Sequence, residues 1–336
     1  MNEAIVEKPL ASFCVKSYNQ KKHLIEALKG AFAQTYRPLE IVISDDGSTD
    51  GSWEYIQQAV EEFKKSHDDV PVIINHNSPN LGNLGNWQKC CELAHGELLV
   101  KADGDDISFP ERTEEVMAFW VRDAKRAKIV SCGGIQIDPN GKELGRVEGK
   151  ELFGAFCAYA KDLFLEFPYA VRFPRALDDT LYVARARMFG NVIIHVPKVL
   201  VKYRIGTGVS SALFDVRVPF ERCVPLIVPA IRQGFIDVRY LKSLGHYVPE
   251  DLPRALTKDL RQHYDSAVLA GGAFSARILA FSRIQKENPC RCYTPLYFQR
   301  LCFLLPRRIG DVFLYFYTIP NYVRKIVLSW IRRNVC

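Results

Sequence analysis

Residues 39–52 read LEIVISDDGSTDGS, and residues 97–106 read ELLVKADGDD. Each stretch is a mainly apolar run that ends in acids, Asp45-Asp46 in the first and Asp103-Gly104-Asp105-Asp106 in the second. Short apolar runs of this kind indicate buried strands. Since the carboxyl ends of parallel strands meet at one edge of a sheet, we expect the two acidic turns to lie close together.

Strand and helix signals alternate along the first hundred residues. Apolar runs predict strands at residues 11–16, 39–44, 70–75 and 97–102. Apolar residues at helical spacing predict helices at residues 22–34, 52–65 and 86–94. This alternation predicts an α/β fold, with a mostly parallel sheet flanked by helices on both faces. Ligands of such sheets bind beyond the carboxyl ends of the strands.

The pattern changes beyond residue 106. Residues 128–147 predict a hairpin around the turn Asp138-Pro139-Asn140-Gly141. Weaker signals predict helices at 161–167 and 180–189 and strands at 192–196 and 199–203. The small residues between Gly206 and Ser211 indicate a loop. We therefore predict one domain over residues 1–210 and a mainly helical region over residues 211–336.

Composition excludes several classes of protein. The 336 residues are 48% hydrophobic and 25% charged, as in ordinary globular proteins and unlike disordered, collagen-like or disulfide-scaffold chains. A net charge of +7 suits an anionic ligand or membrane surface but is too small to indicate nucleic acid. The ten cysteines form no CxxC pair and no zinc-finger spacing, which favours free thiols in a reducing cytoplasm. Residues 1–10 lack the pattern of a secretory signal, and no apolar run reaches the ~20 residues of a spanning helix.

The acidic turns are the strongest indication of chemistry. Carboxylates this close repel one another unless a cation neutralises them. A hard divalent ion, Mg²⁺ or Mn²⁺, bound to carboxylate oxygens and to the diphosphate of a ligand would meet that need. A single acidic turn is more often a polar turn that caps the next helix. Two of them at successive strand ends favour the ion site.

Two other segments are weaker indications. An aromatic side chain follows the first predicted strand in Ser17-Tyr18-Asn19, where it could stack on a nucleobase or simply pack under a loop. The stretch NLGNLGNW at residues 80–87 places two glycines before a helix, where backbone groups can approach a phosphate. The stretch is neither a dinucleotide-binding nor a Walker motif.

The order of these pieces resembles an inverting glycosyltransferase of family 2 with the GT-A fold, which is Rossmann-like. The resemblance covers roughly residues 9–204. It rests on four stretches, SFCVKSYNQKKHLIEALKGAFAQTYRPLEIVISDDGSTDGS, NSPNLGNLGNWQKCCELAHGELLVKADGDDISFPER, GAFCAYAKDLFLEF and ALDDTLYVARARMFGNVIIHVPKVLVKYR. It implies transfer of a sugar from a nucleotide-diphosphate sugar donor to an acceptor hydroxyl, in polysaccharide or glycolipid assembly.

The resemblance also implies roles for individual residues. Asp103 and Asp105 match the DxD motif for the metal ion and the donor, with Asp106 as the acid that follows. Asp179 matches the general base, although the pair Asp178-Asp179 is also a common start for a helix. The expected donor-binding residues, with the base assigned to Tyr18 and the base or ribose to Asp46, are Ser17, Tyr18, Asn19, Asp46, Asn86, Asp103 and Arg185.

The sequence departs from the family at two places. Relatives often carry a donor-binding arginine in the helix after the glycine stretch, where this chain has Asn86-Trp87-Gln88-Lys89, so Asn86 or Lys89 is the expected substitute. Many relatives carry a histidine after the equivalent of Tyr203-Arg204, where this chain has Ile205-Gly206-Thr207. Metal retention is therefore expected to differ in detail.

The C-terminal region lies outside the resemblance. Residues 291–336 interleave eight basic residues with aromatic ones and contain one acid, Asp311. Such a pattern is typical of helices on an anionic bilayer, with a lipid-linked acceptor at hand, and equally of a subdomain packed on the catalytic domain. Localisation is accordingly predicted as cytoplasmic, with or without peripheral attachment to the membrane.

Two competing functions remain open at this stage. A sugar-nucleotide-binding partner subunit without catalysis would not need the acids at 103, 105 and 179. A nucleotidyltransferase would need a glycine-rich basic loop after the first strand, where this chain has Ser17-Tyr18-Asn19-Gln20. Assays of released nucleoside diphosphate and pyrophosphate separate these two functions from sugar transfer. For the sugar transfer itself, a double-displacement mechanism would need a nucleophile that no residue offers.

Overall fold

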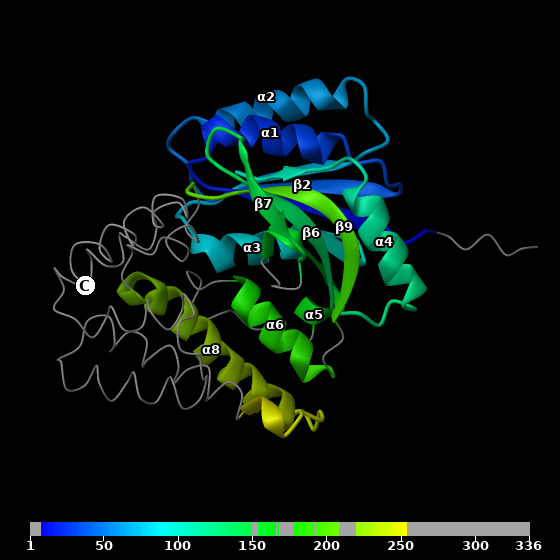
Figure 1. Cartoon of the computed structure of the whole chain (residues 1–336), viewed down its shortest axis with the longest axis vertical. Helices are drawn as coiled ribbons and strands as arrows, with labels where there is room; N and C mark the ends of the chain where they lie inside the picture. Colours follow the sequence, from blue (N-terminus) through cyan, green and yellow to red (C-terminus); the bar gives the residue numbers. More distant parts are fainter. Residues whose placement is uncertain are drawn as a thin grey trace, which may run out of the picture. The chain divides into compact units, whose positions relative to one another are not determined.

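A computed structural model of the chain describes residues 8–149, 154–165, 167, 178–190, 193–207 and 220–253 (Figure 1). The chain divides into two compact units, residues 1–208 with 229–256 and residues 209–228 with 257–336. Nearly all described residues belong to the first unit. Residues 229–256 thus join that unit from beyond the predicted boundary near residue 210, and the boundary itself stays a prediction.

Strands and helices alternate in the first part of the chain, as predicted. In chain order they are β1 (Ala11–Ser17), α1 (Lys21–Phe32), β2 (Leu39–Asp45), α2 (Ser52–Lys64), β3 (Val72–His76), α3 (Gly82–Leu93) and β4 (Leu98–Asp103). The remaining described elements are β5 (Ile107–Ser108), α4 (Arg112–Arg122), β6 (Ile129–Ile137), β7 (Glu143–Val147), a short 3₁₀ helix (Gly154–Phe156), β8 (Cys157–Ala160), α5 (Asp162–Leu165), α6 (Asp178–Met188), β9 (Ile193–Arg204) and α8 (Phe220–Ser243).

Within the described residues, nine strands form one mixed sheet in the order β3-β2-β1-β4-β8-β6-β9-β5, with β7 beside β6. The first four strands run parallel to one another, and β8 pairs antiparallel with both β4 and β6. In the register of the parallel strands, Ser17 lies opposite Asp45 and Lys16 opposite Asp103. Both acidic turns therefore reach the same edge of the sheet.

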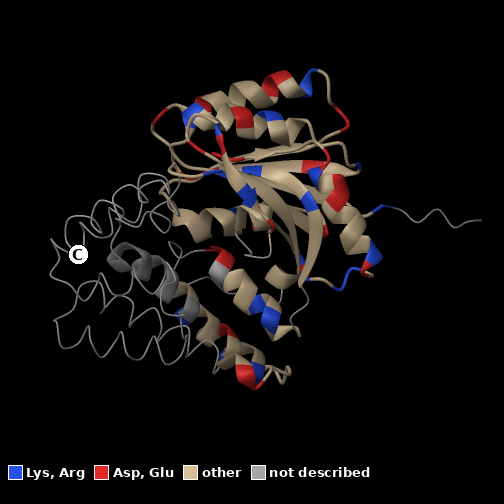
Figure 2. Ribbon diagram, in the orientation of Figure 1, with Lys and Arg blue, Asp and Glu red and all other residues tan. Residues whose placement is uncertain are grey.

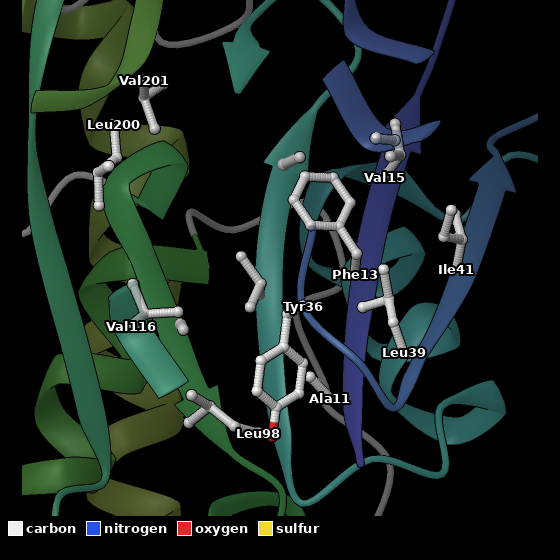
Figure 3. Packing of buried hydrophobic residues seen from close by; sticks show 14 of the residues in the cluster. Ala11, Phe13, Val15, Tyr36, Leu39, Ile41, Leu98, Val116, Leu200 and Val201 are labelled. Atoms are coloured by element: carbon white, nitrogen blue, oxygen red, sulfur yellow. The ribbon is translucent and has the colours of Figure 1, made fainter. Parts of the chain in front are cut away.

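Helices cover both faces of this sheet. On one face, α1, α2 and α4 pack against side chains such as Phe13, Ile41 and Val100. Figure 3 shows part of this cluster, where side chains of β1, β2 and β4 meet those of α4 and β9. On the other face, α3 and α6 pack against Cys14 and Leu99. Full burial of each large apolar side chain contributes roughly 1.5–3 kcal/mol relative to exposure.

Some elements differ from the sequence-based expectation. Helix α3 begins at Gly82, inside the stretch predicted as a glycine loop. The predicted strands at 192–196 and 199–203 form the single strand β9, whose register with β6 shifts between Val196 and Val199. A shift of this kind accommodates Pro197, which has no N–H to donate. Strand β8 and helix α4 had no counterpart in the prediction.

Other expectations concern cysteines and membranes. Cys14, Cys90, Cys91, Cys132 and Cys157 are buried free thiols, and burial raises the pKa of Cys90 to about 12. Among the helices that the structure describes, none combines the length and hydropathy that crossing a bilayer requires. The basic and aromatic stretch at residues 291–336 lies outside the described residues.

Candidate functional site at the carboxyl edge of the sheet

Asp45, the last residue of β2, makes its hydrogen bonds within the turn that follows the strand. Its carboxylate accepts hydrogen bonds from the Ser48 amide at 2.9 Å and from the Ser48 hydroxyl at 2.5 Å. The Nδ1 of His76, at the end of β3, lies 2.8 Å from the same carboxylate. Asp45 therefore closes the turn and ties it to β3.

Asp46, the second acid, holds the start of α3. Its carboxylate accepts the backbone N–H groups of Leu81 and Gly82, each at 2.8 Å, and the Asn77 amide at 2.9 Å. The first N–H groups of a helix have no partner inside the helix, and the positive end of the helix dipole attracts an anion. These bonds explain why α3 begins at Gly82 and not at Asn86.

The two predicted asparagines also brace loops. The Asn86 amide is buried and donates to the carbonyls of Ser17 and Ser44, at 3.3 and 3.1 Å. Asn19 has a positive φ of 50° and accepts the Thr49 N–H at 2.8 Å. Tyr18, which lies between Ser17 and Asn19 in the chain, is 48% exposed. Of the residues expected to touch the base, Tyr18 thus has the accessible side chain.

The turn after β4 is tight and leaves its acids close together. The Asp106 N–H donates to the Asp103 carbonyl at 3.1 Å, and the Gly104 N–H donates to the Lys16 carbonyl at 2.9 Å. A Cβ on Gly104 would come within 2.7 Å of the Gln20 side chain. The Lys16 carbonyl would lie 3.2 Å from the same Cβ, so a larger residue between Asp103 and Asp105 would crowd the end of β1.

Asp105 and Asp106 are buried and resist ionisation. Burial and the nearby charge of Asp103 raise the pKa of Asp105, against a 2.7 Å hydrogen bond from the Thr207 hydroxyl. Burial and the charges of Asp105 and Asp103 raise the pKa of Asp106 well above its usual range, against a 2.7 Å bond from the Arg204 N–H. A bound cation would lower both pKa values, because it favours the ionised carboxylates.

Two lysines connect this turn to the start of α6. The Lys16 ammonium lies 3.2 Å from Asp103 and 3.3 Å from Asp178, and it also contacts the Asn83 side chain. The Lys101 ammonium lies 3.3 Å from Asp103 and 3.0 Å from Asp178. The structure thus brings Asp103 and Asp178, far apart in the sequence, to the same pair of cations.

The pKa shifts of this cluster follow from the pairing. Burial alone would lower the pKa of Lys101, but Asp103 and Asp178 outweigh it and raise that pKa. Burial alone would raise the pKa of Asp178, but Lys101 and Lys16 hold that pKa well below its usual range. Asp178 and Lys101 are therefore both charged at neutral pH.

Helix α6 carries the other predicted acid, Asp179. The Asp178 carboxylate accepts the Asp179 N–H at 3.0 Å and the Asn83 amide at 3.2 Å. A Cβ on Gly154 would lie 3.5 Å from the Cβ of half-buried Asp179. Figure 2 shows these acids in the first turn of α6 and basic residues in its last turn, the arrangement that the helix dipole favours.

Arg185, also on α6, contacts a different helix. Its guanidinium Nε donates to the Asp237 carboxylate of α8 at 2.7 Å, and both side chains are at most 1% exposed. The Arg185 guanidinium also stacks over Phe167, 4.3 Å from the ring centroid. Its expected contact with the donor stays a prediction.

Comparison with known proteins follows this geometry. The sequence model of glycosyl transferase family 2 matches residues 12–181, half of the chain, and so includes both acidic turns and the start of α6. The chain belongs to glycosyl transferase family 2. The family expected from the sequence is thereby confirmed.

The chain resembles individual members of the family at low sequence identity. It is 28% identical over 139 residues to EpsE of Bacillus subtilis (strain 168), named as a glycosyltransferase, covering 41% of this chain and 48% of EpsE. It is 27% identical over 197 residues to the abequosyltransferase RfbV of Salmonella typhimurium (strain LT2), covering 57% of this chain and 53% of RfbV. The chain thus spans about half the length of these relatives.

Solved structures share the fold at low identity. A mannosyltransferase of Pyrobaculum calidifontis, in complex with GDP-Man and Mn²⁺, is 16% identical with a TM-score of 0.56, over 94% of this chain and 89% of the other. Residues 1–349 of S. aureus TarS, in complex with UDP-GlcNAc, are 16% identical with a TM-score of 0.54, over 89% and 82%. At this identity the likeness concerns the fold alone, and it confirms the GT-A fold expected from the sequence.

The acids of this family 2 enzyme partly fit a divalent ion. In the part of the chain that the structure describes, no three His, Cys, Asp or Glu side chains are grouped to hold a metal by themselves. Among the same residues, the buried Ser17 hydroxyl and one buried oxygen of Asp106 have no hydrogen-bond partner. A partial carboxylate set beside unsatisfied oxygens fits an ion that takes its remaining ligands from a diphosphate.

Sequence reasoning missed Lys16 and Lys101 in this enzyme. The signal was present, because each lysine interrupts an otherwise apolar strand, in FCVKS and in LLVKAD. A lysine inside a buried strand needs a paired carboxylate. Lys101 also precedes Asp103 by two residues, which places both side chains on one face of β4.

Proposed function

We propose that this family 2 enzyme is an inverting, metal-dependent glycosyltransferase that uses a nucleotide-diphosphate sugar. The acceptor would be a hydroxyl group on a glycan or a lipid-linked glycan. The observation that carries the proposal is the shared pairing of Asp103 and Asp178 with Lys16 and Lys101, because it joins the donor-side acids to the helix of the predicted base. The nucleotide sugars bound to the two solved relatives support the donor class.

The general base is assigned to Asp179 and not to Asp178. Both oxygens of Asp178 are engaged, one by Asn83 and the Asp179 N–H, the other by the two lysines. A carboxylate whose pKa is held well below its usual range by two ammonium groups is a poor proton acceptor. Asp179 follows it directly, in the first turn of α6.

The donor side is assigned to the turn after β4. Asp105 and Asp103 would hold a divalent ion, with Mg²⁺ or Mn²⁺ as the expected ion, and Tyr18 would stack on the base. An ion held there would neutralise the charge of the departing nucleoside diphosphate. The other proposed donor contacts are Asp46, Asn19, Asn86, Ser17 and Arg185. The side chains of Asp46, Asn19 and Asn86 also hold the surrounding loops in place.

The proposed reaction is a single displacement at the anomeric carbon. Asp179 takes the proton of the acceptor hydroxyl as the new glycosidic bond forms and the bond to the diphosphate breaks. General-base assistance of this kind contributes roughly 10²–10⁴-fold. Inversion follows, because one attack from the face opposite the leaving group reverses the anomeric configuration.

The donor can be found before the acceptor is known. A panel of nucleotide sugars with Mn²⁺ should raise the thermal midpoint of the full chain only where the donor fits, since ligand binding stabilises the folded state by mass action. The sugar nucleotide with the largest shift is then assayed for release of nucleoside diphosphate. Release of pyrophosphate would indicate a nucleotidyltransferase, and binding without release would indicate a non-catalytic partner.

Asp179→Asn is expected to lower nucleoside diphosphate release by about 10²-fold or more, while donor binding stays within about threefold of wild type. The matched control is Asp162→Asn, which changes an exposed acid at the start of another helix, α5. Release at the wild-type rate from a folded Asp179→Asn variant would remove the base assignment.

A further inference from the structure

Lys16, Lys101 and Asp103 project from one face of the sheet. Lys16 lies opposite Asp103 in the parallel register of β1 and β4, and Lys101 precedes Asp103 by two residues on β4. Side chains at these positions point to the same side. This is the face that α3 and α6 cover, since Cys14 and Leu99, two residues before each lysine, pack in the cluster with Trp87 and Leu181.

Both lysines are buried, with exposed fractions of 8% for Lys16 and 1% for Lys101. A buried ammonium is costly unless carboxylates pair with it. Each lysine has two carboxylate partners, and the same two carboxylates serve both lysines, so two positive charges meet two negative ones. Such a cluster resists any movement that separates its members, because separation would leave a buried charge uncompensated.

Asp178 is held from four directions. The lysines reach it from β1 and β4, Asn83 reaches it from α3, and the Asp179 N–H reaches it from its own helix. The first turn of α6 cannot shift without straining the contacts of Asp178 with Lys16, Lys101 and Asn83. Asp179 belongs to the same turn, so its position relative to Asp103 is set through the lysines.

We propose that Lys16 and Lys101 are positioning residues, a lysine bridge that fixes the base-bearing turn of α6 at a set distance from the donor-side acid Asp103. This inference rests on the proposed function of Asp179. The lysines contact neither the sugar nor the acceptor in this role. They act through Asp103 and Asp178.

Gly154, which lies beside Lys101 and Asp179, supports the same role. A Cβ at this position would lie 2.5 Å from the Lys101 ammonium and 3.5 Å from the Asp179 Cβ. The ammonium is the end of a flexible side chain, so a methyl group at residue 154 would displace it while the backbone keeps its conformation. Gly154 thus leaves the space that Lys101 occupies in the bridge.

The test compares Lys101→Met with the double variant Lys101→Met/Asp178→Asn in the full chain. The single variant leaves a buried carboxylate undercompensated and should unfold at a lower temperature. The double variant removes one charge of each sign and should regain most of that stability. Nucleoside diphosphate release should stay about 10²-fold below wild type in both, since α6 is no longer held in place.

The other measurements separate positioning from general damage. Affinity for UDP or GDP with Mn²⁺, whichever nucleotide stabilises the wild-type chain, should stay within about threefold. Lys128→Met is the matched control, because it breaks an ion pair with Asp162 outside the bridge, and its release rate should equal wild type. Recovery of the rate together with stability in the double variant would overturn the bridge and leave a purely structural role.

Gly154→Ala keeps the inference testable if Lys101→Met does not fold. It should lower release by about tenfold or more without loss of nucleotide affinity, whereas Gly145→Ala, with open space around the new methyl group, should not change the rate. A folded Gly154→Ala enzyme with the wild-type rate would contradict the bridge. Asp179→Asn, assayed alongside, separates the failures: if it keeps full rate, the proposed function fails, and if it is inactive while Lys101→Met is fully active, only the bridge fails.

Discussion

The two acidic turns of this glycosyltransferase look alike in the sequence and differ in their surroundings. After β2, the carboxylates of Asp45 and Asp46 accept hydrogen bonds from the neighbouring loop and from the start of α3. After β4, Asp105 and Asp106 repel each other and Asp103, and their pKa values are raised. The carboxylates of the first turn are compensated by hydrogen bonds, whereas Asp105 and Asp106 in the second turn keep a mutual repulsion that a bound cation would relieve.

Acids at the end of a strand therefore do not by themselves indicate a ligand site. Backbone N–H groups and a helix dipole can stabilise a carboxylate without a metal ion. What distinguishes a ligand site is the charge that the chain itself leaves uncompensated. Single substitutions in each turn test this difference.

The largest effect is expected at Asp105. Asp105→Asn should lower nucleoside diphosphate release by about 10²-fold or more, because the negative charge of the leaving group loses one of its stabilisers. Chelation of divalent ions from the wild-type enzyme should give a similar loss. In the absence of metal, the Asp105→Asn variant should unfold no more easily than the wild type, since the substitution removes a charge that its neighbours repel. Unchanged turnover after exhaustive chelation would contradict the metal role of this turn.

A smaller effect, on stability, is expected at Asp46. Asp46→Asn should lower the free energy of unfolding by roughly 1.5–3 kcal/mol, because the variant loses a charged acceptor for the first N–H groups of α3. Urea denaturation measures this change. Asp69→Asn, at an exposed pair with Arg37, is the control and should leave the unfolding midpoint unchanged. Full stability with lost donor binding would instead assign the Asp46 carboxylate to the donor.

The smallest effect is a pH dependence at Asp106. Its raised pKa means that the folded state disfavours the ionised carboxylate, so the wild-type chain pays a stability penalty above that pKa. The penalty disappears as the pH falls below about 3.9, the ordinary pKa of Asp.

Denaturation with EDTA at several pH values tests this expectation. The stability of Asp106→Asn should exceed that of the wild type most at neutral pH, and the difference should shrink as the pH falls toward 4. A difference that grows on acidification would mean that the Asp106 pKa is lowered, and the second turn would then resemble the first.

Much of the fold could be predicted from sequence patterns. The four parallel strands and the hairpin of β6 and β7 follow from apolar runs and turn residues, and their bounds agree within a few residues. The start of α3 could not be predicted, because Asp46, from a distant turn, supplies the partners for its first N–H groups. Strand β8 could not be predicted either, since its four residues depend on β4 and β6 for their pairing.

The sequence alone determined the family, the two acidic turns and the positions of the four parallel strands along the chain, because these depend on local periodicity and on residues adjacent along the chain. Only the tertiary structure decided what each acid contacts. It separated Asp46, bound to α3, from Asp105, and it brought Lys16 and Lys101 between Asp103 and Asp178. The reason is physical, since the energy of a charge depends on burial and on neighbours within a few ångströms, and both arise from chain segments far apart in sequence.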